Sequence, residues 1–389
     1  MKLQDFTFDL PENLIAQYPP AERGASRLML LDRQSGETSD RMVSELPAIL
    51  KALFPKPPLL VFNNSRVRKA RIYGLDEAGA KIEFLLLESR DGGSTWECLF
   101  QKKRRHKEGG RFVFMDGHLS KPLPQPLPQG EGSMSQGEGH FDKLNDRWLS
   151  LSKPLTATIH FHEGNRYLQF DQPIDEAWLE KNGHIPLPPY IKRPDENEDA
   201  ERYQTVYARE LGSAAAPTAG LHFTEGLLNE LRQNGIDTAF ITLHVGLGTF
   251  LPVREENIEE HKMHREFYHI DEATARLIND AKYSGRPVVT VGTTSMRCTE
   301  SAWDDAAQCI RAGDSSTDIF IYPGYHFKVA DALFTNFHTP GSTLLMLVSA
   351  FCQAKGAKQT GPEMILGAYK EAVAKKYRFF SYGDAMLIY

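Results

Sequence analysis

The segment Asp271–Arg297, which reads DEATARLINDAKYSGRPVVTVGTTSMR, indicates the fold class most clearly. Asp271 is a typical N-cap for a helix that runs to Ser284, and Gly285 is a typical helix stop. The run Val288–Val291 consists of β-branched residues, and Thr290 is its one polar side chain. A helix followed by an apolar strand is typical of an α/β domain with a largely buried sheet.

The same alternation continues on both sides of this segment. Thr224 is expected to cap a helix that ends at Asn234, and a strand is expected over 236–245. Leu59–Phe62 reads as a buried strand. Further helices are expected near 296–308, 342–354 and 363–376, with strands near 319–322 and 385–388. The sequence therefore predicts the α/β class, with a large mixed α/β domain.

A different pattern interrupts this alternation. Residues 68–171 contain short strand-like runs separated by Gly- and Asp-containing turns: Arg71–Leu75, Lys81–Leu87, Trp96–Gln101, Arg111–Met115, Thr156–Phe161 and Tyr167–Phe170. Short strands at such spacing favour a small antiparallel β-barrel. We predict that 68–171 is an inserted barrel domain and that 1–67 with 172–389 is a discontinuous α/β domain. Within the insertion, 121–139 repeats Pro-Leu-Pro-Gln and Gln-Gly-Glu-Gly and is expected to be a disordered loop.

Composition excludes several classes of protein. The chain has 389 residues, a net charge of −6, an apolar fraction of 41% and four cysteines without a CxxC pair. These values exclude a disulfide scaffold, a cysteine-rich zinc module and a globally basic nucleic-acid binder. No apolar run reaches about 18 residues, and the first residues lack the order of a signal peptide. We therefore expect a cytoplasmic protein with no membrane association.

Two glycine-containing motifs follow predicted strands. His244–Phe250 reads HVGLGTF, and its two glycines lack the third glycine and the helix of a dinucleotide fingerprint. They either let a ligand approach the backbone or only bend the chain. Val291–Arg297 reads VGTTSMR at a strand-to-helix turn. Its hydroxyl residues either cap the helix or leave helix amides for an anion such as a carboxylate.

Histidine and basic clusters also have two readings each. His261 and His264 are three residues apart, but no carboxylate or HExxH pattern completes a zinc site, so no metal is expected. The run KKRRHK over 102–107 either meets phosphate or is a solvated turn. Gly212–Phe223 combines small residues with three polar ones and either packs tightly or lines a pocket floor.

Taken together, the motifs resemble one family, the S-adenosylmethionine:tRNA ribosyltransferase-isomerases of queuosine biosynthesis. The resemblance covers nearly the whole chain except the 121–139 segment. It is carried by Leu14–Pro20, Ser26–Leu28, Asn63–Val67, Tyr203–Ala208, Gly212–Phe223, Thr242–Phe250, His261–His264, Val291–Arg297, Ile321–Tyr325, Thr335–His338 and Phe380–Leu387.

The resemblance implies an α/β domain with an inserted β-barrel, and it implies a reaction. The ribosyl part of S-adenosylmethionine moves to 7-aminomethyl-7-deazaguanine at the wobble position of tRNA and is isomerised, giving epoxyqueuosine-tRNA, adenine and methionine. The implied partners are that tRNA and S-adenosylmethionine as co-substrate, with no cofactor. We expect a monomer.

Candidate site residues follow from the motifs that resemble the family. We expect acid–base roles for His222, His244 and Asp384. For S-adenosylmethionine, we expect the methionine carboxylate to be held by Thr293, Thr294 and Ser295. The nucleoside is expected to approach the backbone at Gly246 and Gly248, and the sulfonium to contact the ring of Tyr325. For tRNA, the candidates are the basic residues Arg66, Arg68, Lys102, Lys103, Arg104 and Arg105.

Two alternatives remain open at this stage. A methyltransferase is suggested by Val245–Gly248, although the helix and the acidic residue that it needs are not evident. An RNA-binding module without activity is suggested by the barrel, but it leaves the polar motifs of the α/β domain unexplained. A methyl-labelled donor separates the first alternative from ribosyl transfer, and adenine release excludes the second.

Overall fold

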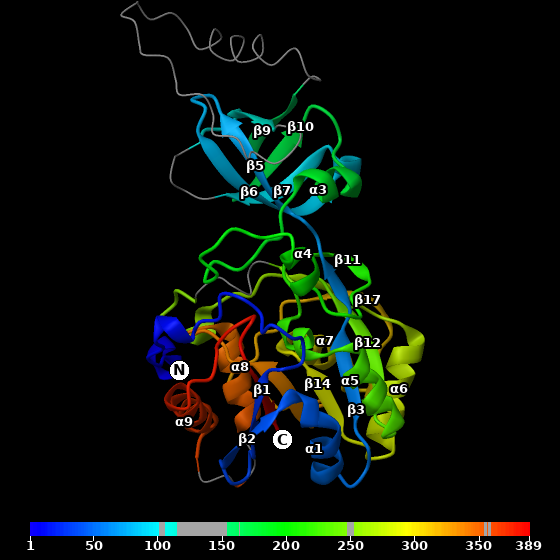
Figure 1. The fold of residues 1–389 in the computed structure, drawn as a ribbon. Coiled ribbons are helices and arrows are strands. Elements are labelled where there is room, and N and C mark those ends of the chain that lie inside the picture. The colour runs from blue at the N-terminus through cyan, green and yellow to red at the C-terminus, as the bar shows by residue number, and fades with distance from the viewer. Residues whose placement is uncertain (101–105, 115–153, 163, 247–252, 354–355, 357–358) are drawn as a thin grey trace, which may run out of the picture. The chain divides into compact units, whose positions relative to one another are not determined.

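The computed structural model describes residues 1–100, 106–114, 154–162, 164–246, 253–353, 356 and 359–389. It confirms a mixed α/β fold with a closed antiparallel barrel (Figure 1). The chain divides into one unit of Met1–Val67 with Leu187–Tyr389 and a second unit of Arg68–Pro186. The predicted loop at 121–139 lies outside the described residues.

The larger unit contains a nine-stranded sheet. Its order is β17 (Gly313–Thr317), β13 (Glu266–Ile270), β12 (Asp237–Leu243), β3 (Leu59–Asn63), β14 (Val288–Val291), β18 (Ala332–Asn336), β19 (Ala385–Ile388), β1 (Arg27–Leu31) and β2 (Thr38–Met42). The neighbours β12, β3, β14 and β18 are mutually parallel, whereas β19 runs antiparallel to β18. The carboxyl ends of the four parallel strands therefore meet at one edge of the sheet.

Helices cover both faces of the central part of this sheet, which explains why strands such as β3 and β14 are buried throughout. On one face, α1 (Leu46–Leu53) and α5 (Glu225–Gln233) share a core with β3 and β14. On the other face, α6 (Glu272–Tyr283) and α7 (Thr293–Ala302) pack on the alternate residues of the same strands. Helices α8 (Thr343–Cys352) and α9 (Gly361–Ala374) pack against β1 and β19.

Local signals set several helix ends. The Thr224 and Asp271 side chains accept hydrogen bonds from the third residues of α5 and α6, which confirms both predicted caps. The strand expected at 319–322 is wrong. Strand β17 ends at Thr317, whose hydroxyl accepts the Ile319 amide, and the chain then leaves the sheet to bury Ile321 in the core.

The second unit is the barrel, with all its strand pairs antiparallel. Its order is β10 (Asn165–Phe170), β7 (Thr95–Phe100), β6 (Lys81–Arg90), β5 (Arg71–Asp76), β8 (Arg111–Phe114) and β9 (Leu155–His162). Asp175 caps α3 (Glu176–Asn182), and Leu179 of that helix is buried in the barrel core. Because of this packing the unit extends to Pro186 rather than ending at the expected 171.

None of the helices in the described ranges is long and apolar enough to cross a membrane.

Candidate functional site

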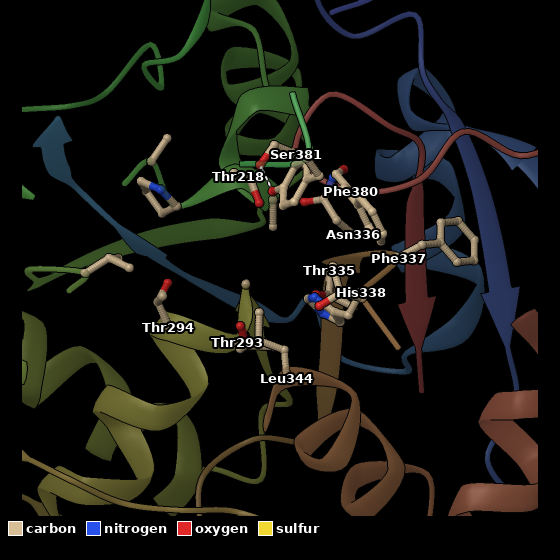
Figure 2. A pocket seen from close by; sticks show the side chains of 17 residues that line it. Thr218, Thr293, Thr294, Thr335, Asn336, Phe337, His338, Leu344, Phe380 and Ser381 are labelled. Carbon is tan, nitrogen blue, oxygen red and sulfur yellow. Dashed lines mark hydrogen bonds between the residues drawn. The ribbon is translucent and has the colours of Figure 1, made fainter. Parts of the chain in front are cut away.

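A pocket lies in the larger unit at the carboxyl ends of the parallel strands, where open α/β sheets commonly bind ligands. Its space is about 620 Å³, including its open mouth. Figure 2 shows side chains from the start of α7, the end of β18 and the segment before β19, together with Thr218 and with Leu344 of α8. The pocket is lined by Tyr190, Ala216, Pro217, Thr218, Ala219, Val245, Gly292, Thr293, Thr294, Thr335, Asn336, Phe337, His338, Thr339, Leu344, Phe380 and Ser381. These lining residues include no Asp, Glu, Lys or Arg.

The start of α7 contributes free donors to this pocket. Gly292 has a φ of 91°, a left-handed conformation that favours glycine, and it turns β14 directly into α7. Among the described residues, no side chain caps the first amides of α7. The Ser295 hydroxyl donates to the Val291 carbonyl at 2.8 Å, so it is already used at the strand-to-helix turn. The Thr294 hydroxyl is buried and has no hydrogen-bond partner in the part of the chain that the structure describes. Thr293 and Thr294 line the pocket, and Ser295 does not.

A buried polar chain forms another wall of the pocket. Asn336 Nδ2 donates to the Phe380 carbonyl at 3.1 Å and to His222 Nε2 at 3.0 Å. Because His222 Nε2 accepts, the proton of the neutral ring is on Nδ1, which donates to Ser26 Oγ at 2.9 Å. Both Nδ2 hydrogens of Asn336 are thus used, and its Oδ1 is buried without a partner. These hydrogen bonds fix the orientation of the Asn336 amide at the pocket.

The two buried histidines of this region, His222 and His338, are neutral at physiological pH. Burial, with a smaller contribution from the Arg23 and Arg378 charges, lowers the pKa of His222 to about 3. Burial likewise lowers the pKa of His338 to about 3. His338 Nε2 lies 2.9 Å from the Thr335 hydroxyl. His222 contacts the lining residue Asn336 without lining the pocket, while His338 lines the pocket itself.

His244 directly follows β12, and its amide donates to the Phe267 carbonyl at 3.0 Å. Its ring packs on Gly212, where an added Cβ would lie 3.1 Å from the imidazole. His244 is partly exposed and is not among the pocket-lining residues, although its neighbour Val245 is. The structure thus places this candidate beside the pocket.

Gly246 begins the segment that follows. Its amide donates to Glu266 Oε1 at 3.1 Å, and the other oxygen of that carboxylate pairs with Arg297. Glu266 and Arg297 are both almost fully buried, and burial lowers the pKa of Arg297 to about 10. This pair ties the end of β12 to α7. Gly248, the second candidate glycine, lies outside the described residues.

The Asp384 carboxylate accepts hydrogen bonds from two backbone amides. One carboxylate oxygen accepts the Arg27 amide at 3.0 Å and the other accepts the Arg378 amide at 2.8 Å. Burial raises the pKa of Asp384, and the hydrogen bonds from the two amides oppose that rise. Asp384 does not line the pocket, so the structure does not bring it together with the other candidates.

The aromatic candidate is also displaced from the pocket. The Tyr325 hydroxyl donates to Glu300 Oε2 at 3.2 Å, and burial followed by the Glu300 charge raises its pKa. Tyr325 is not a lining residue. The aromatic wall is formed instead by Tyr190 and Phe380, whose ring centroids are 4.7 Å apart.

Of the basic residues expected to bind tRNA, the structure describes Arg66 and Arg68. Arg66 is exposed on β4 (Ser65–Val67) in the larger unit. Arg68, in the barrel unit, forms an ion pair with Glu176 at 2.6 Å and is mostly buried. Lys102, Lys103, Arg104 and Arg105 lie outside the described residues.

For a metal, the part of the chain that the structure describes contains no group of three ligating side chains. His261 Nδ1 lies 3.0 Å from Glu255 Oε2, which is a two-residue contact.

The sequence reasoning missed the pocket roles of Asn336, His338, Tyr190 and Phe380. Three of these four lie within motifs that the resemblance used, Thr335–His338 and Phe380–Leu387. The available signal was a polar residue directly after an apolar strand, which places a side chain at the carboxyl edge of the sheet.

Comparisons with known proteins agree on one family. The family described as queuosine biosynthesis protein matches residues 3–388. The S-adenosylmethionine:tRNA ribosyltransferase-isomerase of Treponema denticola is 50% identical over 390 residues and covers 100% of both chains. Proteins of the same name from Clostridium kluyveri and Geobacter metallireducens are 46% and 44% identical, also over 100% of both chains.

A solved structure is similar as well: the crystal structure of an S-adenosylmethionine tRNA ribosyltransferase from Thermotoga maritima. It is 31% identical, the match covers 99% of this chain and 100% of that one, and the TM-score is 0.49. The family match over residues 3–388, together with full-length relatives at 44–50% identity, shows that the chain belongs to the queuosine biosynthesis protein family.

Proposed function

We propose that the protein is an S-adenosylmethionine:tRNA ribosyltransferase-isomerase. It transfers and isomerises the ribosyl moiety of S-adenosylmethionine onto 7-aminomethyl-7-deazaguanine at the tRNA wobble position, and releases adenine and methionine. The relatives of this name support the proposal over the full length of the chain. The observation on this chain that carries it is a pocket at the carboxyl edge of the sheet, beside uncapped helix amides, whose described lining residues include no charged side chain.

The absence of charge in the pocket lining suits the nucleophile. A primary amine is mostly protonated in water because its pKa is near the lysine value of about 10. A desolvated site with no carboxylate disfavours the ammonium form and lowers that pKa. The amine of the deazaguanine is therefore expected to be uncharged when it enters the pocket.

Recognition of S-adenosylmethionine is assigned to two walls. The amides of Thr293 and Thr294 and the Thr294 hydroxyl would hold the methionine carboxylate at the start of α7. The faces of Tyr190 and Phe380 would contact the sulfonium cation. Asn336 Oδ1 would accept a hydrogen bond from a substrate N–H, because it is the unpaired atom of a fixed amide.

Proton transfer is assigned to His244 as the first candidate. An imidazole beside the pocket and partly exposed keeps access to water, unlike the buried ring of His222. Elimination of methionine needs removal of the acidic C5′ proton next to the sulfonium. We propose that His222 positions Asn336 through their hydrogen bond. We propose that Asp384 holds two backbone amides in place.

The reaction is redox-neutral, so we expect no cofactor besides the co-substrate. We expect the protein to work as a monomer in the cytoplasm.

Mass spectrometry of precursor tRNA incubated with the protein and S-adenosylmethionine tests this function. The expected result is epoxyqueuosine in the tRNA, with adenine and methionine released in equal amounts. Transfer of a labelled methyl group to RNA would instead indicate a methyltransferase, and binding without adenine release would indicate an RNA-binding module.

A further inference from the structure

A second, smaller hollow lies next to the pocket in the same unit, and arginine side chains line it. We name it the arginine hollow and define it by Arg23, Ser26, Arg202, His222 and Ser381. Its space is about 270 Å³, including its mouth. Ser381 lines both the hollow and the pocket, so the two spaces adjoin at this residue.

The guanidinium groups here are fixed by backbone carbonyls rather than by carboxylates. Arg23 donates to the carbonyls of Gln204, Leu221 and Glu201, at 2.9, 3.4 and 3.1 Å. Arg202 donates to the Pro20 and Ala21 carbonyls at 2.5 and 3.3 Å, and Arg378 donates to the Tyr18 carbonyl. Neutral acceptors hold each group in place without cancelling its charge.

No ion pair to a carboxylate is formed by Arg23, Arg202 or Arg378 within the described part of the chain. Burial lowers the pKa of Arg23 and the Arg202 charge lowers it further, while the Glu201 charge opposes the shift. The Arg23 and Arg378 charges lower the pKa of His222. Asp384 interacts with the Arg378 charge, and both its carboxylate oxygens accept backbone amides. Repulsion among like charges is relieved when an anion binds between them.

The guanidinium groups also keep donors for a ligand. Each has five N–H donors, of which the carbonyls take three from Arg23, two from Arg202 and one from Arg378. All three residues are only partly buried. Half-buried arginines with spare donors match the oxygens of a phosphate.

We propose that the arginine hollow binds a backbone phosphate of the tRNA next to the wobble nucleotide, while that nucleotide's base occupies the pocket. This inference rests on the proposed function. A base extruded from the stack into a pocket stays joined to its flanking phosphates, which therefore lie near the pocket. Ser381 lines both spaces, so the hollow adjoins the pocket on the side where such a phosphate could bind. The methionine carboxylate is the other anion in the reaction, but the start of α7 already offers it amides.

Binding of precursor tRNA, which carries 7-aminomethyl-7-deazaguanine at the wobble position, to the full chain tests the proposal when it is measured at several salt concentrations. Arg23→Gln and Arg202→Gln should each lower the slope of log K against log salt by about 0.7, which corresponds to about fivefold weaker binding at 0.1 M salt. Arg202→Lys should keep the slope, because the charge remains. Arg276→Gln, on an exposed i,i+4 pair of α6, is the matched control and should change nothing.

Two results would overturn the proposal. If the salt slope of tRNA binding is unchanged in variants whose melting temperature matches that of the control, the arginines only stabilise the fold through their hydrogen bonds to backbone carbonyls. If the Kd of S-adenosylmethionine rises while tRNA binding is unchanged, the anion is the methionine carboxylate. Adenine release by the protein without substitutions is measured in parallel, and it tests the proposed function separately from the phosphate site.

Discussion

The pocket and the arginine hollow share Ser381 and differ in charge. The pocket is lined by hydroxyl, amide, aromatic and aliphatic groups, with one neutral histidine. The hollow has two arginines in its wall and a third nearby, none paired with a carboxylate among the described residues. A neutral, partly apolar space favours uncharged reactants, whereas fixed cations favour phosphate.

This difference suggests a division of work within one unit. Anchoring of the RNA by charge is separated from the space in which an amine has to lose its proton. If the cations lined the pocket itself, they would also repel the sulfonium of the co-substrate. The polar chain Ser26–His222–Asn336 connects the two spaces, since His222 lines the hollow and Asn336 lines the pocket.

The largest expected effect is on proton transfer from beside the neutral pocket. His244→Ala should reduce turnover by about 10²- to 10⁴-fold and leave S-adenosylmethionine binding within a few-fold, because a general base is lost and no binding contact is. Single-turnover assays and thermal melts on the same variant measure both. Normal turnover in a well-folded variant would remove His244 from the mechanism and leave the chemistry to groups inside the pocket.

The next effect concerns the fixed amide between the two spaces. Asn336→Ala should lower kcat/KM by about 10²-fold, because the acceptor Oδ1 is lost. His222→Gln should lower kcat/KM less and mainly loosen Asn336, and it should leave the salt slope of tRNA binding unchanged. If the activity of both variants simply follows the folded fraction in melting curves, the hydrogen bonds that join His222 to Asn336 serve only packing.

An acid-sensitive stability should accompany the neutral histidines. The pKa of His222 and of His338 is about 3 in the folded chain, below the unfolded value of about 6.5. The unfolded chain therefore binds protons that the folded chain does not. The stabilisation is complete above about pH 6.5 and is lost as the pH falls, by roughly 1 kcal/mol per histidine per pH unit. Urea unfolding at pH 7.5 and 5.5 measures it, and His338→Gln should flatten the dependence.

The smallest effect is expected at the start of α7. Thr294→Val keeps the shape of the side chain and removes its unpartnered hydroxyl, so the KM for S-adenosylmethionine should rise several-fold with little change in kcat. The free protein should become slightly more stable, because a buried hydroxyl without a partner is costly. An unchanged KM together with a higher melting temperature would show that the hydroxyl takes no part in binding.

The sequence allowed the fold to be predicted wherever the signal was local. The caps Thr224 and Asp271 and the apolar run Val288–Val291 depend on neighbours within a few residues, and all three appear in the structure as expected. The strand expected at 319–322 failed because burial of Ile321 in a distant core outweighs its β-propensity.

The site was less predictable because long-range packing assembles it. Thr293 and Thr294 could be placed, since a strand-to-helix turn presents amides whatever surrounds it. Asn336 and Tyr190 meet only through the folded sheet, and no spacing in the sequence joins them. Asp384 lies in a motif with several polar residues, yet its carboxylate holds two amides of distant segments, which sequence alone does not reveal.

The position of β19 also has a consequence for how the chain folds during synthesis. In the sheet, β1 pairs on one side with β2 and on the other with β19, and Leu28 is opposite Ala385. The β1–β2 hairpin therefore cannot join the rest of the sheet until the ribosome has released the segment around Ala385. Contacts of such long sequence separation form slowly because a very large loop must close first. Until then, the nascent chain exposes an apolar strand edge of the kind that chaperones protect.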